Sequence, residues 1–133
     1  IFHIDFGYIL GNFLTFAGID RETTPFVLTP EFVTVMGGNP SAGYDRFVTL
    51  CCEAYRIVRK HTNLFVTLFS ILLETGIPRL SKEKDLQYFL SALQVGATDE
   101  EATLYFKELI TISQENFRSR LNFGIHILAN PDD

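Results

Sequence analysis

The chain has 133 residues, of which 47% are apolar, so it suits one domain or part of one and can bury a sizeable core. Its net charge of −5 argues against a generally basic nucleic-acid-binding surface, and we expect no nucleic-acid partner. No signal peptide is visible, and no uninterrupted apolar run reaches the roughly 18 residues of a membrane span. Because the first residue is not Met and lies inside an apolar run, we expect a piece of a longer protein.

The first four residues predict a short buried strand that ends at Asp5. From there to about residue 29 the chain has no stable periodicity, and a connection of this length is usually functional or disordered. A carboxylate at the end of an apolar run is a candidate for chemistry. An Asp that only caps a turn at the end of a strand is the common alternative.

Residues 30–129 predict a helical body, so the expected fold class is mainly α. Thr29 fits the N-cap of the first helix, Pro30 fits its first turn, and two glycines follow its end. Thr98 and Glu101 match a capping box near the start of a later helix. Further helices are expected over residues 43–61, 63–76, 82–96, 102–113 and 116–129.

Two features of this helical body carry specific expectations. The helix over 63–76 is apolar almost all round, which is typical of the buried centre of a helical domain. Cys51 and Cys52 are adjacent, and neighbouring cysteines seldom bridge each other because their Cβ vectors diverge on a helix. We therefore expect buried thiols in a reducing compartment, with a redox role as the alternative.

The opening "FHIDFG" resembles the metal-binding motif of the phosphoinositide 3-kinase and 4-kinase superfamily, which opens the activation loop of a kinase C-lobe. Three further blocks match in order: "PFVLTPEF", "LCCEAYRIVRKHTNLF" and "LLETGIPRLS". Together they are similar to class I or class II phosphoinositide 3-kinases, whereas "GYILG" is closer to class III. The similarity runs from the first residue to about residue 129.

The resemblance implies the helical C-lobe of a kinase-like α+β fold, with a short N-terminal strand and a long activation loop. Residues 1–133 would be a partial kinase domain, 5–29 the activation loop and 30–129 the body of the lobe. The family's catalytic loop and its phosphate-binding Lys would lie upstream of this chain, so we expect this polypeptide alone to be inactive.

The same resemblance assigns roles to residues of the opening motif. Asp5 would be the ligand of Mg²⁺ (or Mn²⁺), a hard cation that takes carboxylate and phosphate oxygens, and ATP would be the co-substrate. Ile4, Phe6 and Gly7 would complete the cofactor-binding stretch. His126 matches a family position and is a candidate for a place near the catalytic loop, with plain helix packing as its alternative.

The expected activation loop is poor in cations. Where class I enzymes that use the 4,5-bisphosphate carry a first basic cluster, this chain has Leu14, Thr15 and Phe16. Arg21 is the only basic residue between Asp5 and Arg46. Because each phosphate needs paired cations, we expect phosphatidylinositol or its 4-phosphate as substrate, contacted by Arg21, Phe16 and Gly18. A local ion pair with a neighbouring acid is the alternative role for Arg21.

Two further groups suggest contacts. In the last helix Phe117, Arg118, Arg120 and Phe123 combine aromatic rings and cations, which suits a membrane interface, although core packing is the alternative. The cations at the end of the helix over 43–61 suit its macrodipole, and contact with the loop or a membrane is the alternative; they are Arg56, Arg59, Lys60 and His61.

The leading interpretation is a lipid kinase C-lobe that phosphorylates the inositol 3-hydroxyl. The expected protein is cytoplasmic and peripherally membrane-associated, and a regulatory subunit is a candidate partner. A phosphatidylinositol 4-kinase, a large protein kinase of the same superfamily and a non-catalytic pseudokinase module are the alternatives.

Overall fold

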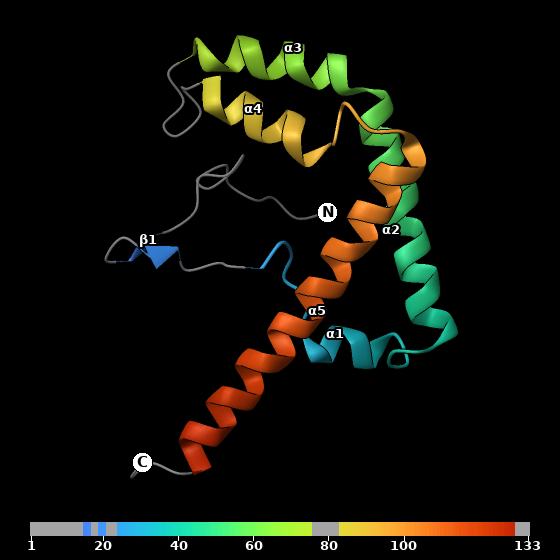
Figure 1. The fold of residues 1–133 in the computed structure, drawn as a ribbon, viewed down its shortest axis with the longest axis vertical. Helices are drawn as coiled ribbons and strands as arrows, with labels where there is room; N and C mark the ends of the chain where they lie inside the picture. The colour runs from blue at the N-terminus through green and yellow to red at the C-terminus, as the bar shows by residue number, and fades with distance from the viewer. Residues whose placement is uncertain (1–14, 17–18, 21–23, 76–82, 130–133) are drawn as a thin grey trace. The chain divides into compact units, whose positions relative to one another are not determined.

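The computed structural model describes residues 15–16, 19–20, 24–75 and 83–129, with side chains described from 24 to 75 and from 83 to 116 (Figure 1). This part of the chain is mainly helical, as predicted. It falls into two compact units, one drawn from residues 1–23 and 56–102 and the other from 24–55 and 103–133. The predicted strand over residues 1–4 lies outside the described residues.

The second unit contains α1 (Pro30–Val35), most of α2 (Ala42–Lys60) and most of α5 (Asp99–Ala129). The predicted cap of α1 is confirmed, because the Phe32 N–H donates to Thr29 Oγ1 at 3.4 Å. After α1 the chain turns through two glycines with φ of +96° and +89°, a conformation that favours glycine.

The core of this unit lies between α1, α2 and α5. Its buried residues come from all three helices and from the segment before α1. Partly buried side chains of α2, of α5 and of the C-cap of α1 pack against them. The buried set is Leu28, Val33, Tyr44 and Ile110, and the side chains around it are Met36, Phe47, Val48, Cys51 and Phe106.

The first unit contains α3 (Thr62–Leu73) and α4 (Glu83–Ala92), which run side by side in Figure 1. The rings of Phe65 and Phe69 contact the ring of Phe89, with centroids 5.9 and 5.2 Å apart. The expectation that this apolar helix is a buried centre was wrong for the described structure, where no α3 side chain is buried. Since α4 contacts one side of α3, another side stays exposed, at Leu64, Leu68 and Ile71.

The α5 helix corrects a second expectation. We predicted separate helices over 102–113 and 116–129, but α5 runs unbroken for 31 residues. No Gly or Pro lies between them, and the Ser113 hydroxyl donates to the Leu109 carbonyl at 2.8 Å, within the helix. The predicted capping box is confirmed, because the Thr98 N–H donates to Glu101 Oε2 at 2.9 Å and the Glu101 N–H to Thr98 Oγ1 at 3.2 Å.

The expected activation loop contains a short antiparallel pair, β1 (Thr15–Phe16) and β2 (Ile19–Asp20). Thr15 is paired with Asp20 and Phe16 with Ile19. Sequence periodicity did not predict this pair, because two-residue strands are too short to show an alternating pattern.

Candidate functional site

The predicted metal and nucleotide residues come first in the chain. Ile4, Asp5, Phe6 and Gly7 lie outside the described residues, so their roles stay predictions. Within the ranges described, no group of three or more His, Cys, Asp or Glu side chains could hold a metal ion.

The predicted substrate and membrane residues are only partly placed. Phe16 lies in β1, whereas Gly18 and Arg21 fall outside the described residues. The backbone of α5 carries the remaining predicted site residues, whose side chains are not described: Phe117, Arg118, Arg120, Phe123 and His126. Among the helices described, none is both long and apolar enough to cross a membrane.

The downstream end of the expected activation loop is placed clearly. The Phe26 N–H donates to Ser113 Oγ at 2.9 Å, across 87 residues of sequence. The Phe26 ring meets the Phe106 ring edge-on, with centroids 5.4 Å apart. Two residues later Leu28 is buried, with 5% of its surface exposed. The segment that leaves the loop is thus held against α5 by a hydrogen bond and by apolar packing.

Gln114, the next residue of α5, binds the segment that follows α1. Gln114 Oε1 accepts one hydrogen bond from Asn39 Nδ2 at 3.0 Å and another from the Tyr44 hydroxyl at 2.8 Å. Gln114 is 9% exposed and Tyr44 is 7% exposed, so the bond between these two side chains is buried, whereas the bond from Asn39 is partly buried. Burial raises the pKa of Tyr44 above its ordinary value, and the nearby charge of Asp45 adds to the shift.

Sequence analysis missed this polar pair, although a signal was present. Ala102, Phe106 and Ile110 form an apolar row along α5 at a spacing of four residues. Ser113 and Gln114 occupy the next turn of the same row, where further apolar residues would be expected. Polar residues that continue an apolar row of a helix are candidates for buried hydrogen bonds.

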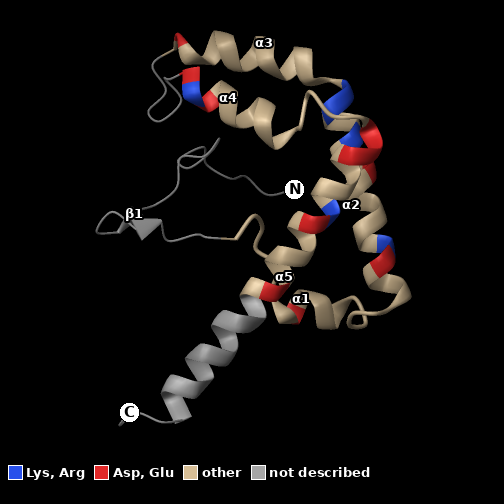
Figure 2. Cartoon of the chain, in the orientation of Figure 1, with Lys and Arg blue, Asp and Glu red and all other residues tan. Residues whose placement is uncertain are grey.

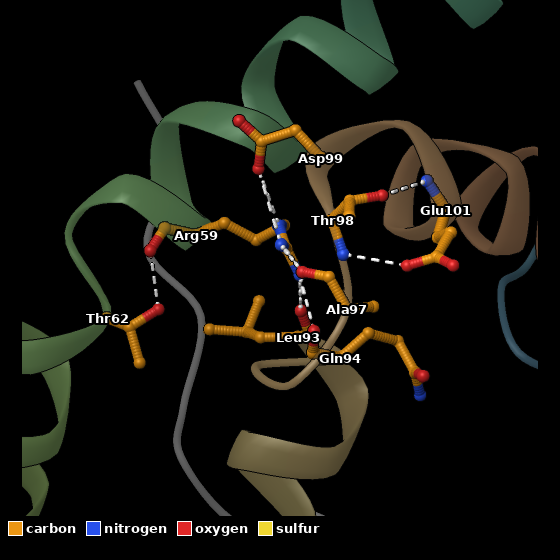
Figure 3. A network of polar contacts seen from close by, with 8 residues as sticks. All are labelled: Arg59, Thr62, Leu93, Gln94, Ala97, Thr98, Asp99 and Glu101. Atoms are coloured by element: carbon orange, nitrogen blue, oxygen red, sulfur yellow. Dashed lines mark hydrogen bonds and ion pairs between the residues drawn. The ribbon is translucent and has the colours of Figure 1, made fainter.

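A second polar network lies in the other unit and centres on Arg59, in the last turn of α2 (Figure 3). Its guanidinium donates to the carbonyl of Leu93, to that of Gln94 at 2.7 Å and to that of Ala97 at 2.9 Å. It also pairs with Asp99 Oδ1 at 3.3 Å. These carbonyls lie in the connection between α4 and α5, and that of Gln94 also accepts from the Ala97 N–H at 2.9 Å. Arg59 therefore ties the end of α2 to the connection between α4 and α5.

Of the predicted cations at the end of α2, Arg59 differs from the other three. Figure 2 shows basic residues there, and acidic residues at the start of α5. Arg59 has a side chain only 10% exposed and already carries four partners, so it is committed to the fold. Arg56, Lys60 and His61 are exposed, and their contacts with the loop or a membrane stay predictions.

The two cysteines behave as expected from the sequence. Both are free, Cys52 is buried and Cys51 is partly buried. Burial raises the pKa of the Cys51 thiol, and its neighbour Cys52 adds to the shift. Because the thiolate is the reactive form, this environment disfavours a redox or nucleophilic role.

Comparison with known proteins decides the family. The sequence profile described as "Phosphatidylinositol 3- and 4-kinase" matches residues 1–82. The chain belongs to this family. It is 48% identical over 130 residues to "Phosphatidylinositol 3-kinase 3" of Dictyostelium discoideum, covering 98% of this chain and 8% of that protein. The predicted resemblance to phosphatidylinositol 3-kinases is confirmed.

Two human members of this family extend the match. The chain is 45% identical over 131 residues to "Phosphatidylinositol 4-phosphate 3-kinase C2 domain-containing subunit beta", covering 97% of the chain and 8% of the relative. It is 46% identical over 132 residues to "Phosphatidylinositol 3-kinase C2 domain-containing subunit gamma", covering 97% and 9%. The chain thus spans less than a tenth of these relatives and forms part of a phosphatidylinositol 3-kinase catalytic domain.

Proposed function

We propose that the intact protein transfers the γ-phosphate of ATP to the 3-hydroxyl of phosphatidylinositol, or of its 4-phosphate, at a membrane surface. In this proposal residues 5–29 are the activation loop and residues 30–129 are the body of the kinase C-lobe. The observation that carries the proposal is the "FHIDFG" motif within a family match over residues 1–82.

Asp5 is the proposed metal ligand. A carboxylate offers the hard oxygen donors that Mg²⁺ prefers, and a single carboxylate suffices when phosphate oxygens and water complete the coordination. When bound, Mg²⁺ or Mn²⁺ would neutralise phosphate charge as the γ-phosphoryl group is transferred. Ile4 and Phe6 flank Asp5, and Gly7 allows the chain to turn away from the site.

The proposed lipid preference rests on charge. Arg21 is the single basic residue of the loop and lies between two acids, Asp20 and Glu22. A second ring phosphate adds negative charge that this loop cannot pair, so binding of the 4,5-bisphosphate should be weak. The name of one human relative, a phosphatidylinositol 4-phosphate 3-kinase, agrees with a lightly phosphorylated substrate. Phe16 and Gly18 would contribute the uncharged part of the contact.

The proposed approach to the lipid uses the last part of α5. Phe117 and Phe123 would enter the head-group layer, while Arg118 and Arg120 would meet anionic lipid. The protein would then be cytoplasmic and peripherally membrane-associated, with a regulatory subunit as a further partner. His126 would lie near the catalytic loop.

The test compares substrates with the full-length protein. Vesicles would contain phosphatidylinositol, its 4-phosphate or its 4,5-bisphosphate, and a basic peptide would serve as the protein substrate. We expect 3-phosphorylated product from the first two lipids, with turnover of the bisphosphate lower by about tenfold or more. Strongest turnover on the bisphosphate would contradict the lipid preference. Phosphorylation at the 4-hydroxyl, transfer to the peptide alone or no transfer would contradict the proposed activity.

A further inference from the structure

We propose that Ser113 of α5 is a positioning residue for lipid phosphorylation, because it fixes the point at which the activation loop rejoins the helical body. The inference rests on the proposed function, in which that loop reads the lipid head group. Ser113 lies 87 residues further along the chain than Phe26, the residue that it holds.

The Ser113 hydroxyl makes two hydrogen bonds. Ser113 is fully buried, with 0% of its surface exposed, and its Oγ accepts from the Phe26 N–H at 2.9 Å. The same hydroxyl donates its proton to the Leu109 carbonyl at 2.8 Å. That donation leaves the oxygen free to act as the acceptor for Phe26. The hydrogen bond is partly buried, and Ser113 supplies the acceptor for the Phe26 N–H from a rigid helix.

The segment that contains α1 is bound to α5 on both sides of that helix. Ser113 binds Phe26, which precedes α1, and its neighbour Gln114 binds Asn39, which follows α1. Gln114 also binds Tyr44 in the first turns of α2. The segment from 26 to 44 is therefore fixed to two consecutive residues of α5, and Ser113 is the contact nearest the loop.

The point at which Phe26 is held limits how far the preceding loop can extend. Arg21 precedes Phe26 by five residues in the sequence, and five residues of chain span at most about 18 Å, so the point that holds Phe26 limits the reach of the loop. Without the Ser113 bond, Phe26 keeps only the contact of its ring with Phe106, and the first residue buried in the core is Leu28. Two more residues of free chain add about 7 Å of reach and more conformations to the loop. Head-group contacts should then be made less often, while residues at the other end of the loop are less affected.

The experiment uses the full-length protein and the variants Ser113→Ala and Thr111→Ala. Thr111 is a matched control: its hydroxyl also donates to the carbonyl four residues earlier, at 3.2 Å, but it is exposed. Three quantities are measured, namely kcat/KM for lipid, ATP hydrolysis without lipid, and amide hydrogen exchange over residues 15–28. Ser113→Cys serves as a second variant, since it roughly keeps the side-chain size but accepts hydrogen bonds poorly.

We expect Ser113→Ala to lower kcat/KM for lipid about tenfold while ATP hydrolysis stays within about twofold. Amide exchange near Phe26 should become faster, and Thr111→Ala should change none of the three quantities. Equal loss of both activities, or unchanged exchange near Phe26, would overturn the proposal. Wild-type protein that phosphorylates no lipid would instead contradict the proposed function, while faster exchange near Phe26 in Ser113→Ala would still support the anchor.

Discussion

The two units of the chain each hold a connecting segment with a polar side chain, but they use different chemistry. In one unit Arg59, a charged residue, binds three backbone carbonyls and a carboxylate near the surface. In the other, the neutral side chains of Ser113 and Gln114 accept hydrogen bonds from a backbone N–H, an amide and a hydroxyl. The difference follows the groups that each side chain meets, because a guanidinium only donates hydrogen bonds whereas a hydroxyl or an amide oxygen accepts them.

The two anchors also differ in what they hold. Arg59 binds carbonyls of the connection between α4 and α5, so it stabilises the helical scaffold. Ser113 and Gln114 hold the segment that leaves the expected activation loop. Loss of Arg59 should therefore reduce stability, whereas loss of Ser113 should mainly alter lipid transfer.

The largest effect on stability is expected from Arg59→Ala. The change leaves the carbonyls of Gln94 and Ala97 without their strongest donor, and the free energy of unfolding should fall by about 3 kcal/mol. Arg59→Lys should lose about half as much, because an ammonium group cannot reproduce the planar fork of a guanidinium. Urea denaturation of the intact catalytic domain measures both values.

Arg56→Ala is the matched control for this change. Arg56 lies one turn earlier on α2 and is exposed, and its variant should stay within about 0.5 kcal/mol of wild type. Equal destabilisation by Arg56→Ala and Arg59→Ala would show that the network around Arg59 contributes nothing specific.

A smaller effect on the free energy of unfolding is expected for the hydrogen bond between Gln114 and Tyr44. Gln114→Ala leaves the buried Tyr44 hydroxyl without its acceptor and should cost about 2 kcal/mol, whereas Tyr44→Phe should cost about 1 kcal/mol. The double variant should cost less than the sum, since a phenylalanine ring in place of the phenol needs no acceptor. Additive losses in this double-mutant cycle would contradict a direct bond between the two side chains.

The same tyrosine makes stability depend on alkaline pH. Its pKa is raised in the folded state, so the unfolded chain ionises first, near pH 10. The free energy of unfolding should hold below that pH and fall as the pH rises through the folded pKa. Tyr44→Phe should remove this share of the loss, which urea titrations at about pH 9 and about pH 11 measure. An identical loss in both proteins would assign it to other groups.

The smallest effects are expected at the helix caps. Thr98→Ala removes an acceptor at 3.2 Å from the start of α5 and should cost about 1 kcal/mol. Thr29→Ala removes a longer bond, at 3.4 Å, and should cost about 0.5 kcal/mol. Hydrogen bonds to Thr98 lower the pKa of Glu101, so the capping box should weaken as the pH falls below the ordinary carboxyl range. Equal losses at neutral pH would contradict this ranking of the two caps.

Features set by local sequence were predicted well. The helix expected over 43–61 is found at Ala42–Lys60, and the caps at Thr29 and Thr98 make the bonds that their sequences indicate. Each of these depends on residues no more than a few positions apart. A helix period or a capping pattern is complete in the sequence itself.

Features that depend on distant contacts were missed. Nothing near Arg59 in the sequence indicates carbonyl partners 34 to 38 residues away. Ser113 carried a weak signal as a polar residue on an apolar row, but its partner lies 87 residues away. The continuity of α5 was missed because the polar stretch after residue 112 resembled a break, whereas Ser113 and Gln114 in that stretch make hydrogen bonds to residues far away in the sequence.

The division between nucleotide chemistry and lipid positioning is tested most directly by Asp5→Asn in the full-length protein. We predict that both lipid phosphorylation and lipid-independent ATP hydrolysis fall by at least about a hundredfold while the melting temperature is retained, because the charge that would hold the metal is lost. Ser113→Ala, by contrast, should impair lipid phosphorylation alone. Turnover of Asp5→Asn near the wild-type level would contradict the account.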